Sequence, residues 1–111
     1  MGKVKNILFI MADQLRWDYL GCTGHPAPLT PNLDGLARRG MLFDRCYVQS
    51  PVCGPSRMSF YTGRYVSSHR STWIFVPLPL SERMLGDYLA ADGRDLTLIG
   101  KSHFFPDAAS M

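Results

Sequence analysis

A cysteine and an arginine four residues apart make the stretch from Ser50 to Arg57 a candidate reactive site. Cys53 follows a turn, and Arg57 comes four residues later. Pro55 suits the first turn of a helix, where its missing N–H costs nothing. We therefore expect a helix over 55–62 with the thiol just ahead of it, where free N–H groups and the helix dipole favour an anion. The arginine adds a forked cation, so the stretch predicts a nucleophile beside an oxyanion-binding pocket.

Three apolar runs are the candidate strands that would position this stretch, over residues 4–12, 41–48 and 95–99. The first is continuously apolar, which is typical of a parallel strand buried on both faces. Capping residues predict further helices over 30–40 and 81–93. The alternation of strands and helices predicts an α/β fold, a sandwich built on a largely parallel central sheet.

Polar residues follow the ends of these predicted strands. Asp13 comes after the first strand, the Cys53 stretch after the second, and Lys101 and His103 after the third. Open α/β sheets bind ligands at the carboxyl ends of their strands, so we expect these residues to converge. Hydrolysis of a tetrahedral anion ester needs such a nucleophile, cations and a proton donor. Each residue also has an ordinary alternative, as a helix cap, a surface lysine or a loop histidine. His69 is interpreted as solvent-exposed or locally hydrogen-bonded.

Composition limits the functions that are open to this chain. Its 111 residues make at most one ordinary domain, and its scattered arginines and net charge of +3 argue against nucleic acid. No apolar run approaches the roughly 18 residues of a membrane span. Cys22, Cys46 and Cys53 match neither a disulfide framework nor a zinc pattern. The N-terminal apolar run is too short for a signal peptide, so a cytoplasmic location is expected. The oligomeric state is not predicted.

The arrangement also resembles a known family. Cys-x-Pro-Ser-Arg followed by Thr-Gly-Arg, over residues 53–64, resembles the signature of the sulfatase family in the alkaline-phosphatase superfamily. Gly-Lys-x-His at 100–103 resembles a second motif, and the initial strand ending at Asp13 resembles a third. Residues 30–40 resemble the helix after the first metal-binding loop of the family. The resemblance implies that residues 1–111 are the N-terminal portion of a sulfatase catalytic domain with an alkaline-phosphatase-like fold.

The resemblance implies a modified nucleophile and a metal ion. In this family the cysteine is oxidised to formylglycine, so Cys53 would be modified by a formylglycine-generating enzyme that reads Pro55 and Arg57. A divalent cation, Ca²⁺ first and Mg²⁺ or Mn²⁺ as alternatives, would be bound by Asp13 and the modified Cys53. Gln14 stands where many relatives have a second aspartate; as a neutral amide it either completes the metal shell or lies outside it.

The implied reaction is hydrolysis of a small sulfate ester. Arg57 would hold the nucleophile and the metal site in place, Lys101 would contact the sulfate, and His103 would stabilise the aldehyde hydrate. Asp13 with Gln14 also resembles the choline-sulfatase and phosphonate-monoester-hydrolase branch. A phosphonate monoester or phosphate diester hydrolase, and an inactive fragment with an unmodified cysteine, are therefore alternatives. The family's other metal ligands come downstream, so the isolated chain is expected to bind metal poorly and to catalyse little.

Overall fold

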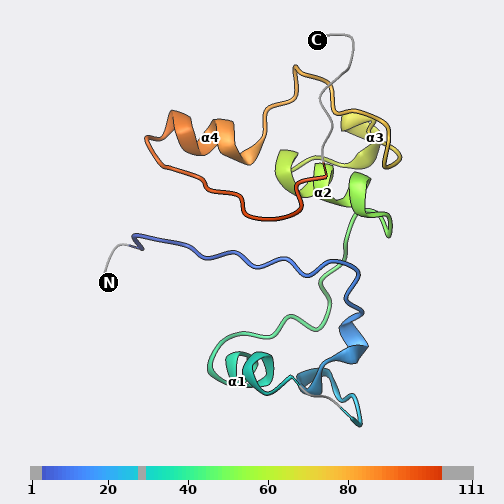
Figure 1. Ribbon diagram of the computed structural model, residues 1–111, viewed down its shortest axis with the longest axis vertical. Helices are drawn as coiled ribbons and strands as arrows, with labels where there is room; N and C mark the ends of the chain where they lie inside the picture. The colour runs from blue at the N-terminus through green and yellow to red at the C-terminus, as the bar shows by residue number, and fades with distance from the viewer. Residues whose placement is uncertain (1–3, 28–29, 104–111) are drawn as a thin grey trace. The chain divides into compact units, whose positions relative to one another are not determined.

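The computed structural model of the chain describes residues 4–27 and 30–103 and divides into two units, one ending at Arg45 and the other beginning at Cys46 (Figure 1). Its regular elements are the 3₁₀ helices η1 (Trp17–Tyr19) and η2 (Gly21–Thr23) and the α-helices α1 (Pro31–Arg39), α2 (Cys53–Thr62), α3 (Val66–His69) and α4 (Leu85–Ala91). Within the described ranges, no helix has the length and apolar character needed to cross a bilayer.

The predicted parallel sheet is absent from the described residues. The apolar runs over 4–12, 41–48 and 95–99 form no strand there, so the prediction of three strands is wrong for this part of the chain. Their large apolar side chains are exposed; Ile7 is 84% exposed and Ile99 is 93% exposed. An apolar pattern describes side-chain burial, whereas a strand also needs a neighbouring strand to complete its ladder of backbone hydrogen bonds. The described residues do not supply that neighbour.

Helix α1, in the first unit, confirms the helix expected over 30–40. It begins at Pro31, whose fixed φ suits the first helical position, and Gly40 closes it by donating its N–H to the carbonyl of Leu36 at 2.9 Å. Its apolar side chains are not covered by the described residues, since Leu33 is 46% exposed and Leu36 is 61% exposed. Apolar packing therefore does not hold α1 in place within its unit.

Polar contacts join α1 to η2 instead. The N–H of Cys22 donates to Oδ1 of Asp34 at 2.8 Å, and the hydroxyl of Thr30 donates to the same oxygen at 3.1 Å. The N–H of Gly21 donates to Oγ1 of Thr30 at 3.0 Å. A Cβ on Gly21 would collide with the carboxylate of Asp34. The threonine hydroxyl thus bridges two elements rather than capping its own helix.

Helix α2, in the second unit, begins two residues earlier than the sequence predicted. Cys53 is its first residue, rather than lying just ahead of it, and Gly63 ends it in the left-handed conformation with φ 66°. Pro55 then occupies the third position, which still costs no hydrogen bond because the first four N–H groups have no partner inside a helix. Most of α2 is buried, namely Gly54, Pro55, Arg57, Met58, Ser59 and Thr62.

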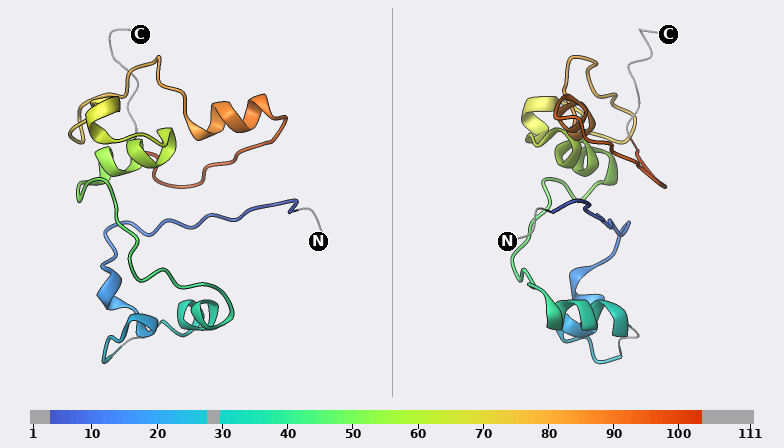
Figure 2. Two further views of the ribbon diagram at one scale, coloured as in Figure 1. Left: turned by 180° about the vertical axis from the view of Figure 1, so that it is seen from behind. Right: turned by 90° about the vertical axis from the view of Figure 1, so that its left-hand side faces the viewer.

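Helices α3 and α4 both contact α2 within the second unit (Figure 2). Helix α4 is shorter than the 81–93 helix that the sequence predicted. Its first turn is set by Asp87, whose carboxylate accepts the N–H of Met84 at 2.7 Å. Glu82 lies before the helix, where its Oε2 accepts a hydrogen bond from Arg64 at 2.7 Å. The bond between Met84 and Asp87 therefore marks the start of the helix, and Glu82 pairs with Arg64 outside it.

Candidate active site

Cys53 lies at the N-terminus of α2 as a half-buried free thiol. The preceding Val52 is extended, so the chain enters the helix at the cysteine itself. Gly54 comes next, and a Cβ there would lie 3.0 Å from the Cα of Ile74. The close approach of these two backbones needs glycine. Backbone packing therefore places the thiol where the first amides of a helix and its dipole favour an anion.

Arg57 connects two of the motifs that the sequence singled out. Its side chain is buried, with 7% exposure, and its Nη1 donates to the main-chain carbonyl of Lys101 at 2.7 Å, across 44 residues of chain. A buried guanidinium needs hydrogen-bond acceptors because its desolvation is costly. The structure thus brings residues 100–103 to the helix that begins at Cys53, as the sequence expected.

Residues 100–103 form a loop with a left-handed residue at each end. Gly100 has φ 99° and His103 has φ 58°. Lys101 is exposed and His103 is half-buried. A left-handed conformation is uncommon for a residue other than glycine, and it persists only where the surroundings hold it. The catalytic roles of Lys101 and His103 stay predictions.

A buried serine–histidine pair joins α2 to α3. His69 has no exposed surface, and its Nδ1 accepts the N–H of Ser71 at 3.1 Å. The neutral ring therefore carries its proton on Nε2, which donates to the hydroxyl oxygen of Ser59 at 2.9 Å. A histidine that donates to a serine cannot also take that serine's proton. Ser59 is accordingly not a second nucleophile. Of the two interpretations of His69, the locally hydrogen-bonded one is confirmed by the bond from Ser71, and the solvent-exposed one is wrong because the side chain is buried.

Burial also keeps His69 neutral. Desolvation has the largest effect and lowers the pKa of its imidazole below the ordinary value of 6.5. The carboxylate of Glu82 opposes this shift, the positive charge of Arg64 adds a smaller lowering, and the backbone of His69 opposes it least. The ring therefore links α2 to the segment at residues 69–71 as an uncharged group.

The predicted metal ligands Asp13 and Gln14 belong to the first unit. Both are exposed, and Gln14 has a left-handed backbone with φ 55°. No group of three or more His, Cys, Asp or Glu side chains that could hold a metal ion occurs among the residues described. These residues alone therefore do not make a metal site, and the assignments of Asp13 and Gln14 as ligands stay predictions.

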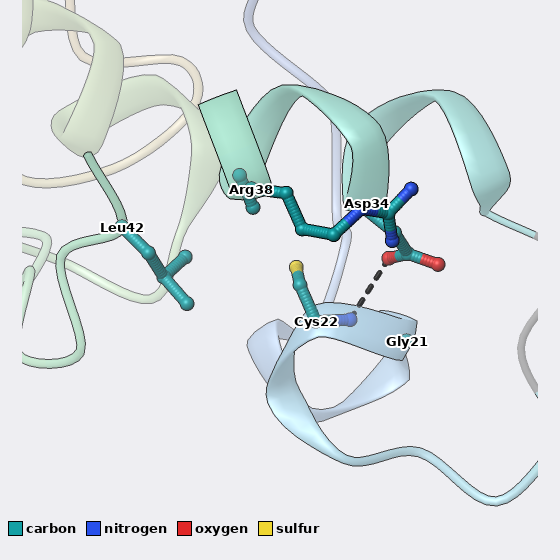
Figure 3. Close-up of a pocket in the computed structure, with 6 residues that line it drawn as sticks. Gly21, Cys22, Asp34, Arg38 and Leu42 are labelled. Atoms are coloured by element: carbon teal, nitrogen blue, oxygen red, sulfur yellow. Dashed lines mark hydrogen bonds between the residues drawn. The ribbon is translucent and has the colours of Figure 1, made fainter. Parts of the chain in front are cut away.

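Cys22, a second thiol, borders a pocket of about 420 Å³ in the first unit (Figure 3). Its backbone N–H is bonded to Asp34, and the side chain of Arg38 lies over the same pocket. The pocket is lined by Gly21, Cys22, Asp34, Ala37, Arg38 and Leu42. Cys22 lies in a 3₁₀ turn of three residues, whereas Cys53 begins an α-helix of ten. The two thiols therefore differ in the environment that the backbone gives them.

Gly54, Ser59 and His69 support α2 but were not singled out by the sequence as parts of the site. The sequence signal for Gly54 is a glycine between a cysteine and a proline, where close backbone approach is a common reason for glycine. Ser59 and His69 are ten residues apart on different helices. No short-range pattern marks such a pair.

Comparison with known proteins identifies relatives of the whole chain. The family model described as Sulfatase matches residues 5–110. Arylsulfatase A of Homo sapiens is 42% identical over 93% of this chain and 22% of its own. N-acetylgalactosamine-6-sulfatase of Mus musculus is 34% identical, over 88% and 21%. The multifunctional alkaline phosphatase superfamily protein PehA of Trinickia caryophylli is 40% identical, over 93% and 21%.

A solved structure is similar to this chain in its fold. The crystal structure of phosphonate monoester hydrolase of Agrobacterium radiobacter matches with a TM-score of 0.83 and 37% sequence identity, over 90% of this chain and 20% of that one. The neighbour supports the alkaline-phosphatase-like assignment, although the described residues here contain no sheet. The chain spans about a fifth of the length of these relatives.

Proposed function

Because the chain belongs to the sulfatase family, we propose that the full-length protein hydrolyses sulfate esters with a nucleophile made from Cys53. The observation that carries this proposal is the arrangement at the start of α2. Cys53 begins the helix, and Arg57 of the same helix binds the loop that contains Lys101 and His103. A nucleophile, a cation and a proton-exchanging group thus belong to segments that are in direct contact.

Each of these groups has a part in the proposed chemistry. Formylglycine made from Cys53 would supply a hydrated aldehyde: one hydroxyl would attack sulfur and expel the alcohol of the ester, and deprotonation of the other would release sulfate and restore the aldehyde. The first amides of α2 favour the sulfate oxygens. Lys101 neutralises charge on the sulfate, and His103 stabilises the hydrate and exchanges its proton.

The signature residues Pro55 and Arg57 are buried, and this burial limits when a formylglycine-generating enzyme could act on Cys53. Pro55 has less than 2% of its surface exposed and Arg57 has 7%, and both lie inside α2. An enzyme that reads these side chains needs them exposed. We propose that the modifying enzyme acts on Cys53 before α2 folds.

The metal requirement of the proposed reaction is met only in part by this chain. Asp13 would contribute one carboxylate, and Gln14 either adds an amide oxygen or lies outside the shell. Hard oxygen ligands suit Ca²⁺, or Mg²⁺ or Mn²⁺ as alternatives. A bound divalent cation supplies positive charge opposite the anion that develops in the reaction.

A substrate panel tests the proposed reaction. The full-length protein, with Cys53 conversion counted by peptide mass spectrometry, is assayed on an aryl sulfate, a phosphate diester and a phosphonate monoester. We expect the aryl sulfate to be turned over fastest. The similarity to a phosphonate monoester hydrolase makes phosphonate the second candidate. Faster turnover of the phosphonate would replace the first proposal with the second. A thiol mass in every preparation made with the modifying enzyme would remove the nucleophile.

Metal titration tests the role of Asp13. We expect Asp13→Ala in the full-length protein to weaken Ca²⁺ binding by at least about tenfold, because a carboxylate ligand is lost. Asp18→Ala is the matched control, since Asp18 is a nearby carboxylate that pairs with Arg16. Equal affinities in wild type and Asp13→Ala would exclude Asp13 as a ligand.

A further inference from the structure

We propose that Arg57 is a positioning residue that fixes the 100–103 loop, and with it Lys101 and His103, against the start of α2. The inference rests on the proposed function in one respect, namely that Lys101 and His103 act on the sulfate ester. The latch itself, meaning the hydrogen bond from Nη1 of Arg57 to the carbonyl of Lys101 at 2.7 Å, is observed directly.

The burial of Arg57 indicates that its guanidinium binds groups of the protein. Only 7% of its surface is exposed, whereas Arg64, just beyond the end of the same helix, is exposed to solvent. A guanidinium taken out of water is stable only when its N–H groups meet acceptors. The main-chain carbonyl of Lys101 is one such acceptor. Because the acceptor is backbone, the bond fixes the path of the loop rather than one side chain.

The loop has a conformation that needs to be held. It is framed by Gly100 at φ 99° and His103 at φ 58°, with Lys101 and Ser102 between them. A non-glycine residue keeps a left-handed conformation only where its surroundings impose it. The carbonyl that Arg57 holds lies two residues before His103. Releasing it would let the loop relax, so that Lys101 and His103 would no longer be fixed relative to α2.

Arg57 and Cys53 belong to the same rigid helix, so the latch also fixes the position of the loop relative to Cys53. The two residues are one helical turn apart on α2. A contact from Arg57 to the loop therefore sets the loop relative to the nucleophile. Displacement of a catalytic group by about 1 Å can cost on the order of 100-fold in rate. Arg57 thus acts on catalysis through Lys101 and His103.

Amide hydrogen exchange on the full-length protein, in its unmodified cysteine form and without substrate, tests the latch. The latch holds a carbonyl, so its loss affects the loop amides through more frequent opening of the loop. We expect Arg57→Met to raise exchange in the peptide covering 100–103 by roughly tenfold or more, which is the effect of a lost hydrogen bond to a charged group on that opening. Arg57→Lys, which keeps one donor, should restore part of the protection. Arg64→Met is the matched control, because Arg64 pairs with Glu82 instead, and it should leave exchange in this loop unchanged.

Kinetics on the converted enzyme separate positioning from anion binding. With rates counted per formylglycine, we expect Arg57→Lys to lower kcat by on the order of 100-fold while KM for an aryl sulfate stays nearly constant. A loss confined to KM would mean that Arg57 binds the substrate anion, and unchanged loop exchange in Arg57→Met would overturn the latch. The exchange result does not depend on turnover, so the latch can fail while sulfatase activity is present, and the reverse also holds.

A second variant leaves Arg57 in place. Gly100→Ala adds a Cβ that meets no atom within 4 Å but strains the left-handed backbone at φ 99°. We expect it to increase loop exchange and lower kcat, with little further loss when Arg57→Lys is added, because both changes act on one loop. Full additivity of the two losses would show that they act independently and would overturn the proposal. The Gly100→Ala variants therefore test the latch even if Arg57→Met does not fold.

Discussion

Helix α1 in the first unit is held by exposed or half-buried side chains, whereas α2 in the second unit is held by backbone packing and buried polar groups. Asp34 of α1 accepts the N–H of Cys22, while Leu33 and Leu36 on the same helix are exposed. In α2 a glycine meets the backbone at Ile74, and an arginine and a serine are buried with hydrogen-bond partners. The helix with the more regular apolar spacing is thus the less buried one.

The difference between the two helices indicates which one must be held in a fixed position. A helix held by exposed side chains can shift at low cost, because water replaces lost hydrogen bonds. A helix whose polar groups are buried cannot shift without leaving them unsatisfied. The candidate nucleophile lies on the second kind of helix, which suits a site that must hold reacting groups in fixed geometry.

The largest expected effect separates the two thiols. Cys53→Ala in the full-length protein should lower aryl sulfate turnover by on the order of 1,000-fold or more, because the nucleophile is lost. Cys22→Ala, in the pocket of the first unit, should leave turnover nearly unchanged. Steady-state kinetics measures both. Equal losses of turnover in the two variants would exclude Cys53 as the source of the nucleophile.

The next effect separates two histidines. His69→Ala leaves the hydroxyl of Ser59 and the N–H of Ser71 without their buried partner, so we expect the free energy of unfolding to fall by about 2–4 kcal/mol. His25→Ala in the first unit loses an exposed hydrogen bond from the N–H of Ala27 and a ring contact with Tyr19, and it should cost less than about 1 kcal/mol because His25 is only half-buried. Urea denaturation of the full-length protein provides the measurement. A smaller loss for His69→Ala than for His25→Ala would contradict the assignment.

Glycine-to-alanine substitutions give the third effect. Gly54→Ala must push back the backbone at Ile74 and should cost about 1–3 kcal/mol. Gly21→Ala meets the side chain of Asp34 and should cost about 1 kcal/mol through lost hydrogen bonds. Gly86→Ala in α4 is the control, since its Cβ would meet only Leu96 at 3.6 Å, and it should stabilise by about 0.5–1 kcal/mol. Thermal denaturation ranks the three, and Gly54→Ala as the mildest would refute the packing argument.

The smallest effect is the pH dependence of stability. Burial lowers the pKa of His69 in the folded protein below 6.5, so the unfolded chain binds the proton more tightly. The contribution of the neutral ring is therefore complete above about pH 6.5 and is lost as the pH falls toward the folded pKa, with a slope of at most about 1.4 kcal/mol per pH unit. Denaturation between pH 5 and pH 8 should show this slope in wild type and lack it in His69→Gln. A slope that persists in the variant would assign it to another group.

Local signals in the sequence predicted both ends of α1 and the end of α2 correctly, whereas α2 begins two residues earlier than predicted and α4 is shorter. Pro31 and Gly40 mark the two ends of α1, and Gly63 marks the end of α2. These signals work because a helix end depends on residues within one turn of it. The motif at Cys53 and the motif at 100–103 were likewise visible as residue types at fixed spacing. The sulfatase family follows from these stretches together with the matches along residues 5–110.

Tertiary contacts decided what the local signals could not. The apolar runs predicted strands, but a strand exists only where a neighbouring segment completes its backbone hydrogen bonds. The described residues supply no such neighbouring segment. The bond from Arg57 to Lys101 spans 44 residues, and the pair of Ser59 and His69 joins two helices. The sequence alone established which chemical groups the protein carries and where α1 and α2 end. Only the folded chain decided which polar groups are buried together, because that depends on partners far apart in the sequence.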